Sequence, residues 1–311
     1  MIVGLGNIGM GYDFNIKSSK IVMTHCKAFS LHPNFNIVAG VDKDIKKKPL
    51  FEKRFKASFY TSIKIALKNY KPEIVVISVN TKDIVSVFYE IIGIHKPSLL
   101  LVEKPISYDY LSGLKIFNYV KKHKINFFVN YIRSADPNTM KLKKLIENEK
   151  SNPNFSGSLY YSRGLYNNAS HFINLLEFLF GSVKKIQIIK KNKDFNRYDP
   201  QPNFILEFEK GSITVLYVNT SIFDGGHIDL VINKKKIYYN CKNGNITYEN
   251  QSRKRNSDSE IKIIKGSMAD YQMNVVKNLD NFLKNKKSII CDGQSALITL
   301  KIISNIHRKL K

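Results

Sequence analysis

The first half of the chain alternates short apolar runs with segments of helical periodicity. The apolar runs are rich in Val, Ile and Leu and nearly continuous, as in parallel strands buried on both faces; they cover residues 1–5, 36–41, 74–79, 99–102 and 126–129. Helix-like segments lie between them at residues 24–31, 62–69, 84–92 and 108–122. Repeated β-α-β units predict an α/β fold with a doubly wound parallel sheet of the Rossmann type.

The pattern changes near residue 130. Helical segments at 138–149 and 171–180 are followed by runs in which apolar and polar residues alternate, at 183–190, 203–209, 212–218, 227–232, 235–240 and 245–249. Such alternation indicates a mostly antiparallel sheet with one covered face. The polar stretch 250–260 is typical of an exposed loop, and helical patterns at 267–283 and 294–310 close the chain.

Two domains follow from this change. We expect a domain with the doubly wound sheet over residues 1–129 and an α+β domain with the mostly antiparallel sheet over residues 130–311. The last helix is expected to be able to pack back on the first domain.

A glycine motif follows the first apolar run directly. Gly4, Gly6 and Gly9 have GxGxxG spacing, in which the first glycine makes a tight turn, the second admits a pyrophosphate and the third lets a helix pack closely on the strand. Asn7 and Ile8 lie within the motif, where N–H groups can face phosphates. We predict that these five residues bind a dinucleotide; the alternative is a purely structural turn.

Asp42 ends the second predicted strand. A carboxylate there accepts hydrogen bonds from ribose hydroxyls and repels a 2′-phosphate, which favours NAD over NADP. Lys43 and Lys46 follow closely and weaken this preference, so NADP stays open. Asp42 also lies farther from Gly9 than the roughly 20 residues that are usual, because residues 10–22 form a polar insertion.

Composition adds one unusual feature, a net charge of +25 from 50 Lys and Arg against 25 Asp and Glu. Such a charge raises nucleic acid or anionic small ligands as partners. The lysines are scattered, however, and an abundance of Lys, Asn, Ile and Tyr without Trp is typical of AT-rich coding sequence. We therefore expect no nucleic-acid partner and take compositional drift as the main source of the charge.

Membrane, export and metal signals are missing from the sequence. We find no basic leader, no apolar run of about 18 residues and no Cys or His spacing that suits a metal or a disulfide framework. The expected location is cytoplasmic, with no membrane partner and no metal.

A second motif, Val-Glu-Lys-Pro at residues 102–105, lies at the end of the strand-like run 99–102. Together with the glycine motif and Thr24-His25, it resembles the glucose–fructose oxidoreductase / inositol dehydrogenase (Gfo/Idh/MocA) family. The resemblance extends to residues 78–81, 130–133 and 167–181. It implies that residues 1–129 form a dinucleotide-binding Rossmann domain and that residues 130–311 serve substrate binding and oligomerisation. It also implies a homodimer or homotetramer that acts on a sugar, a cyclitol or a nucleotide-activated sugar. It also implies a cis peptide bond between Lys104 and Pro105.

Lys104 is the catalytic candidate in this motif. The resemblance places it near the nicotinamide and the substrate alcohol, and a lysine beyond the carboxyl end of a strand can handle a proton. The alternative is a lysine that only pairs with Glu103 or with a phosphate. Four further residues complete the predicted cofactor site: Val79, Asn80, Thr81 and Glu103.

His171 and Asn167 are the catalytic candidates of the second domain. The family pattern has an aspartate four residues before a histidine and another three residues after it, and here Asn167 and Asn174 replace both. His171 can act as a general acid or base on the substrate hydroxyl, whereas asparagine orients groups but supplies no negative charge. The alternative for His171 is a structural histidine.

The predicted substrate site has further members beside these two: Tyr131, Arg133, Arg163 and Tyr166. An arginine there suits a carboxylate or phosphate on the substrate, and the alternative is a role in the domain interface. The leading interpretation is an NAD(P)-dependent oxidoreductase acting on a secondary alcohol, with surface-polysaccharide sugar biosynthesis as one setting. The alternative is a non-catalytic sensor or regulator that binds NAD and a sugar.

Overall fold

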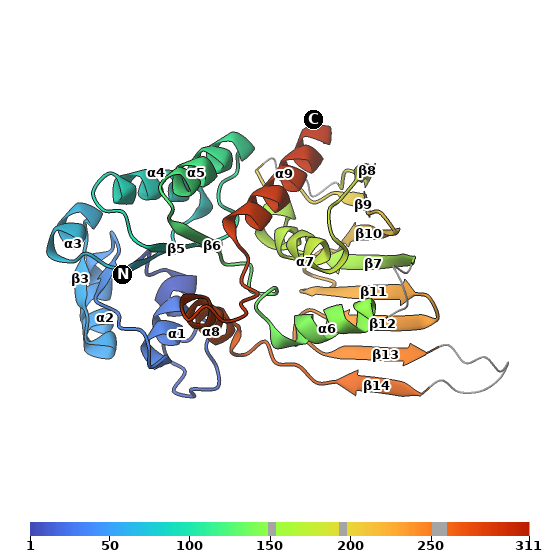
Figure 1. Ribbon diagram of the computed structural model, residues 1–311, viewed down its shortest axis with the longest axis horizontal. Coiled ribbons are helices and arrows are strands. Elements are labelled where there is room, and N and C mark those ends of the chain that lie inside the picture. Colours follow the sequence, from blue (N-terminus) through green and yellow to red (C-terminus); the bar gives the residue numbers. More distant parts are fainter. Residues whose placement is uncertain (149–153, 193–197, 251–259, 311) are drawn as a thin grey trace. The chain divides into compact units, whose positions relative to one another are not determined.

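The computed structural model describes residues 1–148, 154–192, 198–250 and 260–310 (Figure 1). The chain forms two compact units, each made of two segments. Unit 1 comprises Met1–Ala135 and Ala269–Leu300, and unit 2 comprises Asp136–Met268 and Lys301–Lys311. The boundary expected from the sequence lies near the first change of unit, but residues 269–300 belong with the N-terminal sheet.

Unit 1 is built on a six-stranded sheet in the order β3-β2-β1-β4-β5-β6. Every neighbouring pair is parallel, which confirms the doubly wound sheet. The strands are β1 (Ile2–Val3), β2 (Ala39–Val41), β3 (Ser58–Tyr60), β4 (Ile74–Ile77), β5 (Leu99–Val102) and β6 (Asn126–Val129). The sequence pattern misses β3 because only Phe59 of its three residues is buried.

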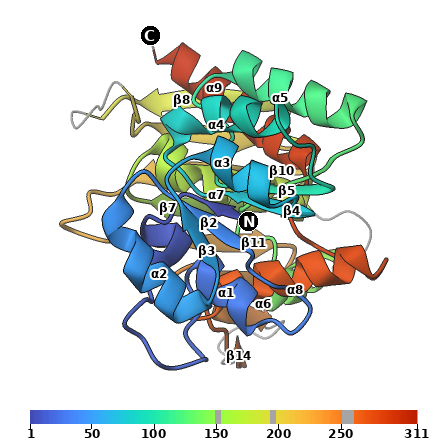
Figure 2. The same ribbon diagram turned by 90° about the vertical axis from the view of Figure 1, so that its left-hand side faces the viewer.

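Helices cover both faces of this sheet. They are α1 (His25–Leu31), α2 (Lys48–Phe55), α3 (Ile63–Asn69), α4 (Thr81–Ile92), α5 (Tyr110–Lys122), α8 (Tyr271–Leu283) and the first part of α9 (Gly293–Lys309). Figure 2 shows α4 and α5 on one face and α1 and α8 on the other. The side chains of Thr24, Ser62 and Asp109 accept hydrogen bonds from N–H groups of the first turn, which fixes where α1, α3 and α5 begin.

Unit 2 is built on an eight-stranded sheet in the order β14-β13-β12-β11-β7-β10-β9-β8. All neighbouring pairs are antiparallel except β7 with β10, which confirms the mostly antiparallel prediction. The strands are β7 (Phe155–Tyr161), β8 (Lys185–Lys190), β9 (Asn203–Glu207), β10 (Gly211–Tyr217), β11 (Gly226–Ile232), β12 (Lys235–Asn240), β13 (Ile246–Asn250) and β14 (Ile261–Ile264).

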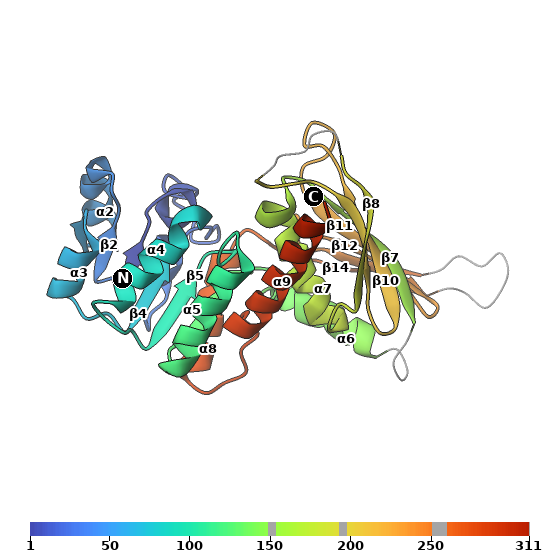
Figure 3. The same ribbon diagram turned by 90° about the horizontal axis from the view of Figure 1, so that it is seen from above.

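Two helices of unit 2, α6 (Pro137–Glu147) and α7 (Ser170–Phe180), lie on the same face of this sheet (Figure 3). The apolar members of the alternating strands, such as Leu159, Ile213 and Leu230, are buried. The sequence pattern misses β7, which is interrupted by Ser and Gly, and β14, whose residues are mostly exposed. Most of the expected loop 250–260 lies outside the described residues.

None of the helices in the described residues is both long and apolar enough to cross a membrane.

Candidate functional site

The three glycines after β1 have three different surroundings. Gly4 has φ +93°, and a Cβ there would lie 2.5 Å from the backbone oxygen of Ser78. A Cβ on Gly9 would lie 2.1 Å from the oxygen of Gly4, whereas a Cβ on Gly6 would meet no heavy atom within 4 Å. Gly4 therefore makes the turn, Gly9 allows close packing, and Gly6 leaves open space where a ligand's phosphates can approach the backbone.

A cavity of about 500 Å³ opens beside this turn, at the carboxyl ends of β1, β2 and β4. Ligand sites of open α/β sheets occupy this edge, and the volume suits one half of a dinucleotide. Its apolar wall includes Ile63, Val79 and Val87, and its polar wall includes Asp42, Lys43 and Lys47. The open space at Gly6, the apolar wall and the carboxylate of Asp42 together fit the adenosine half of a nicotinamide dinucleotide.

The cavity gathers part of the predicted cofactor site: Gly4, Gly6, Asp42, Val79 and Asn80. It is not lined by Asn7, Ile8 or Gly9, which belong to a π-helix, η1 (Asn7–Gly11), nor by Thr81, Glu103 or Lys104. The lining residues that the sequence analysis missed include Lys47, Thr61, Ser62 and Ile63. They lie near β3 and α2, where apolar periodicity is weak.

Asp42 is held by three donors. Its Oδ2 accepts hydrogen bonds from the N–H of Leu5 at 2.7 Å and from the ammonium of Lys47 at 2.8 Å. Its Oδ1 accepts one from the N–H of Asp44 at 2.9 Å. Partial burial opposes ionisation of Asp42, but these hydrogen bonds outweigh it and hold the pKa of the carboxyl below its ordinary value.

The insertion over residues 10–22 is tied to α1. The buried carboxylate of Asp13 accepts hydrogen bonds from the N–H of Met23 at 2.6 Å and from the Thr24 hydroxyl at 2.6 Å. Lys27 donates from Nζ to the oxygens of Ile16 and Ser18, at 2.7 and 2.9 Å. The extra residues thus form a loop that is hydrogen-bonded to the start of α1. Asp42 at the end of β2 still lies next to the glycine turn, where it accepts a hydrogen bond from Leu5.

Behind Lys104 lies a closed ring of four buried polar side chains: His25, Glu103, Asn130 and Gln272. Glu103 Oε1 lies 2.8 Å from His25 Nε2 and accepts a hydrogen bond from Asn130 Nδ2 at 2.6 Å. Asn130 Nδ2 also donates to Gln272 Oε1 at 3.1 Å, and Gln272 Nε2 lies 3.0 Å from His25 Nδ1. Because an amide nitrogen only donates, Nδ1 of His25 accepts the hydrogen bond from Gln272. Nε2 of His25 therefore carries the hydrogen and donates a hydrogen bond to Glu103.

This ring keeps Glu103 ionised. Burial raises the pKa of a carboxyl, but the hydrogen bonds from His25 and Asn130 more than compensate and hold the pKa of Glu103 below its ordinary value. Gln272 was missed by the sequence analysis. It lies in α8, far along the chain from its partners, and nothing in its local sequence marks it.

Lys104 follows β5 and is partly exposed. Its peptide bond to Pro105 is cis, as expected, and its N–H lies 3.4 Å from Glu103 Oε2. Tyr131 and Arg133 follow β6, the neighbour of β5, so all three lie at the same edge of the sheet. Tyr131 is buried and Arg133 partly exposed.

In unit 2, Asn167 and His171 lie on one continuous helical segment. Asn167 is exposed in a π-helix, η3 (Leu165–Ala169), and His171 is partly exposed in the first turn of α7. Asn174 is buried. Asp199, which the sequence analysis missed, accepts hydrogen bonds from the N–H groups of Tyr166 at 2.7 Å and Asn167 at 3.2 Å.

The other two substrate candidates of unit 2 have structural contacts. Arg163 forms a two-pronged ion pair with Asp224, with Nε 2.6 Å from Oδ1. Tyr166 is buried, and its hydroxyl lies 3.0 Å from His307 Nδ1. Within the described part of the chain, no group of three or more His, Cys, Asp and Glu side chains is arranged to hold a metal.

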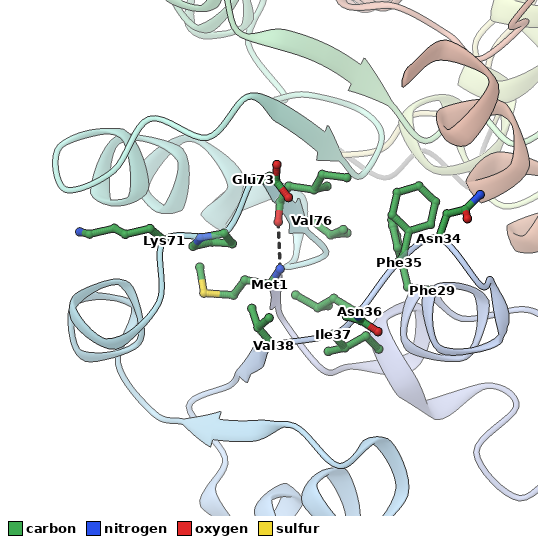
Figure 4. A pocket seen from close by; sticks show the side chains of 13 residues that line it. Met1, Phe29, Asn34, Phe35, Asn36, Ile37, Val38, Lys71, Glu73 and Val76 are labelled. Atoms are coloured by element: carbon green, nitrogen blue, oxygen red, sulfur yellow. Dashed lines mark hydrogen bonds between the residues drawn. The ribbon is translucent and has the colours of Figure 1, made fainter. Parts of the chain in front are cut away.

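A second cavity, of about 340 Å³, lies at the amino ends of β1 and β4 (Figure 4). Its walls include Phe35, Ile37 and Glu73, and the amino group of Met1 donates to the oxygen of Ile74 at 2.9 Å. Open α/β sheets bind ligands at the opposite edge. We therefore place the functional site at the glycine turn.

Comparison with known proteins concerns the first unit and the fold of the chain. Residues 1–131 match the model of the family described as "Oxidoreductase family, NAD-binding Rossmann fold". No curated protein sequence matches the chain.

Three solved structures illustrate the likeness in fold. A super-repressor mutant of Gal80p from Saccharomyces cerevisiae has a TM-score of 0.81 at 13% identity, over 99% of this chain and 94% of that one. The WlbA dehydrogenase from Bordetella pertussis, in complex with NADH and UDP-GlcNAcA, has 0.74 at 16%, over 99% and 94%. UDP-N-acetylglucosamine 3-dehydrogenase GnnA from Acidithiobacillus ferrooxidans has 0.75 at 10%, over 99% and 95%. At these identities the likeness concerns the fold.

Proposed function

We propose that this chain is an NAD(P)-dependent oxidoreductase acting on a secondary alcohol, because residues 1–131 match the model of the Gfo/Idh/MocA oxidoreductase family with its NAD-binding Rossmann fold. The observation that carries the proposal is the presence, at one edge of the parallel sheet, of both the cavity at Gly4 and Gly6 and Lys104. A bound nicotinamide dinucleotide supplies the hydride acceptor or donor.

The chain's own residues supply positioning and proton transfer. Lys104 is proposed to exchange a proton with the substrate hydroxyl, and Glu103, fixed by its buried ring, holds the backbone at Lys104. In unit 2, His171 is proposed as an acid or base, with Asn167 as a group that hydrogen-bonds to a substrate hydroxyl. Asp199 keeps the turn that carries Asn167 in place.

For the substrate we propose a sugar, a cyclitol or a nucleotide-activated sugar. Two proteins of the same fold support the last of these, since one is a UDP-N-acetylglucosamine 3-dehydrogenase and another was crystallised with UDP-GlcNAcA. The exposed Asn167 and the partly exposed His171 and Arg133 supply groups that hydrogen-bond to hydroxyls or pair with an anionic substituent.

The Lys104→Ala variant tests the catalytic role. Without the ammonium group, NADH binding stays within a few-fold of wild type, while turnover falls on the order of 100-fold or more. Substrates come from a screen of sugars and nucleotide sugars by change in NADH fluorescence. Lys121→Ala serves as a control, because Lys121 is exposed, and it leaves NADH binding and turnover unchanged. Full turnover in Lys104→Ala would remove Lys104 from the mechanism.

A sensor without turnover is the second candidate. It is favoured by Asn167 and Asn174, which replace the expected aspartates, and by the shared fold with Gal80p. Transfer of deuterium from labelled NADH to the carbonyl carbon of a keto sugar distinguishes the two, because a sensor binds both molecules and transfers no hydride.

A further inference from the structure

The acceptor capacity of Asp42 is nearly used up within the protein. A carboxylate has about four lone-pair directions. Leu5 and Lys47 occupy Oδ2, and Asp44 occupies Oδ1. One direction therefore remains, on Oδ1, whereas recognition of both ribose hydroxyls by both carboxylate oxygens needs at least one on each. The arrangement differs from that of an NAD-selective acidic residue.

Asp42 is also paired with a lysine. The Asp42 side chain is 13% exposed and that of Lys47 is 27% exposed, so their 2.8 Å ion pair is partly shielded from water. Lys43, the next residue in the chain after Asp42, also lines the cavity, so two lysines and Asp42 belong to the same wall. The other lining carboxylates, Asp83 and Glu90, belong to α4. Lys47 thus offsets the repulsion that Asp42 alone would exert on a 2′-phosphate.

We propose that Lys47 is a specificity-determining residue that lets this cavity accept the 2′-phosphate of NADP(H) as well as NAD(H). The proposal rests on the proposed dinucleotide site and deepens it. Lys47 neutralises Asp42 when the ribose carries a hydroxyl, and with Lys43 it pairs with the phosphate when the ribose carries one. Asp42 keeps its bonds to Leu5 and Asp44 in both cases, so the glycine turn stays in place.

Titration of the purified chain with NADH and with NADPH, followed by nicotinamide fluorescence at fixed ionic strength, tests the proposal without a substrate. The wild type is expected to bind both with Kd values within about 10-fold of each other, or about 1.4 kcal/mol. Lys47→Ala leaves Asp42 as an uncompensated charge, so the Kd for NADPH rises at least about 10-fold while that for NADH stays within about 3-fold.

Two variants complete the experiment. Lys46→Ala is the matched control, because Lys46 is exposed and does not line the cavity, and it changes neither Kd. Lys47→Arg keeps the positive charge and retains NADPH binding. Exclusion of NADPH by the wild type by more than about 100-fold, or equal weakening of both dinucleotides by Lys47→Ala, overturns the proposal. Failure of the wild type to bind either dinucleotide overturns the proposed function with it.

Discussion

Glu103 depends on three residues from distant parts of the chain. His25 opens α1, Asn130 follows β6, and Gln272 lies in α8, so no two of the ring's four members are sequence neighbours. An anionic carboxylate is tolerated inside protein only when donors replace its lost water. His25 and Asn130 are the hydrogen-bond donors to Oε1 of Glu103, and the N–H of Lys104 is the donor to Oε2.

The ring predicts a pH-dependent effect of Glu103→Gln. The folded-state pKa of Glu103 lies below its ordinary value of 4.5, so its stabilisation is complete above that pH and is lost as the pH falls through the folded pKa. At pH 7 the variant should lose about 1–3 kcal/mol of unfolding free energy, because His25 and Asn130 lose a charged acceptor. The deficit should shrink below pH 4.5.

Urea unfolding of wild type and variant between pH 7 and pH 3 measures this difference. Glu73→Gln is the control, since Glu73 is exposed, and it changes stability little at any pH. A deficit for Glu103→Gln that stays constant down to pH 3 would show that the charge of Glu103 contributes nothing.

At the scale of elements, the segment that carries Asn167 and His171 starts from a backbone conformation that glycine adopts without strain and other residues do not. Gly164 precedes η3 with φ +91°, and Asp199 packs against it while accepting hydrogen bonds from the first N–H groups of the helix. A carboxylate at a helix N-terminus satisfies otherwise unpaired donors. The geometry of the candidate catalytic face in unit 2 therefore depends on one glycine and one distant aspartate.

Two glycine variants separate backbone strain from steric clash. Gly164 and Gly181 have similar backbone angles, φ 91° with ψ 160° and φ 82° with ψ −158°. A Cβ at Gly164 would lie 2.1 Å from Asp199 Oδ2, whereas one at Gly181 meets nothing within 4 Å. Gly181→Ala should cost about 1–3 kcal/mol in backbone strain. Gly164→Ala should cost more, because Asp199 must also move.

Thermal unfolding of both variants measures the difference in stability. Equal shifts of Tm for Gly164→Ala and Gly181→Ala would mean that the Asp199 side chain moves away from the new methyl group with no loss of stability. Adding Asp199→Ala to Gly164→Ala removes the clash and should bring the two shifts closer together.

At the scale of the whole molecule, the chain returns to its first unit after building the second. Val275, Val276 and Leu279 of α8 are buried in the same core as Ile2, Leu5 and Val76. Roughly 25 cal/mol per Å² of buried apolar surface holds such a helix in place. The N-terminal sheet is thus completed by residues encoded near the other end of the sequence.

This arrangement predicts a long-range effect of Val276→Ala. The cavity left by the lost methyl groups should cost roughly 2 kcal/mol and loosen unit 1. Hydrogen exchange measured by mass spectrometry should accelerate in β1 and β4 and remain unchanged in β11. Leu230→Ala, at an equally buried site of unit 2, should give the reverse pattern. Uniform acceleration in both units would contradict the division.

The local patterns of the sequence predict most of the architecture. Continuous apolar runs identify five of the strands of unit 1, because a strand buried on both faces leaves a local trace. They fail at β3 and β7, where one buried residue or a Ser-Gly interruption erases the trace. The glycine motif and Asp42 likewise predict a dinucleotide cavity, because their roles follow from backbone chemistry at a strand end.

The sequence by itself thus determined the parallel sheet, the glycine turn and the position of Lys104, since each is specified by neighbouring residues. Only the tertiary structure decided which side chains surround them. It brought Gln272 to His25, Asp199 to Asn167 and Lys47, rather than Lys46, to Asp42. Hydrogen bonds and ion pairs depend on distance in space, and for partners joined through long loops or a turn of helix that distance is set by packing, which no local pattern encodes.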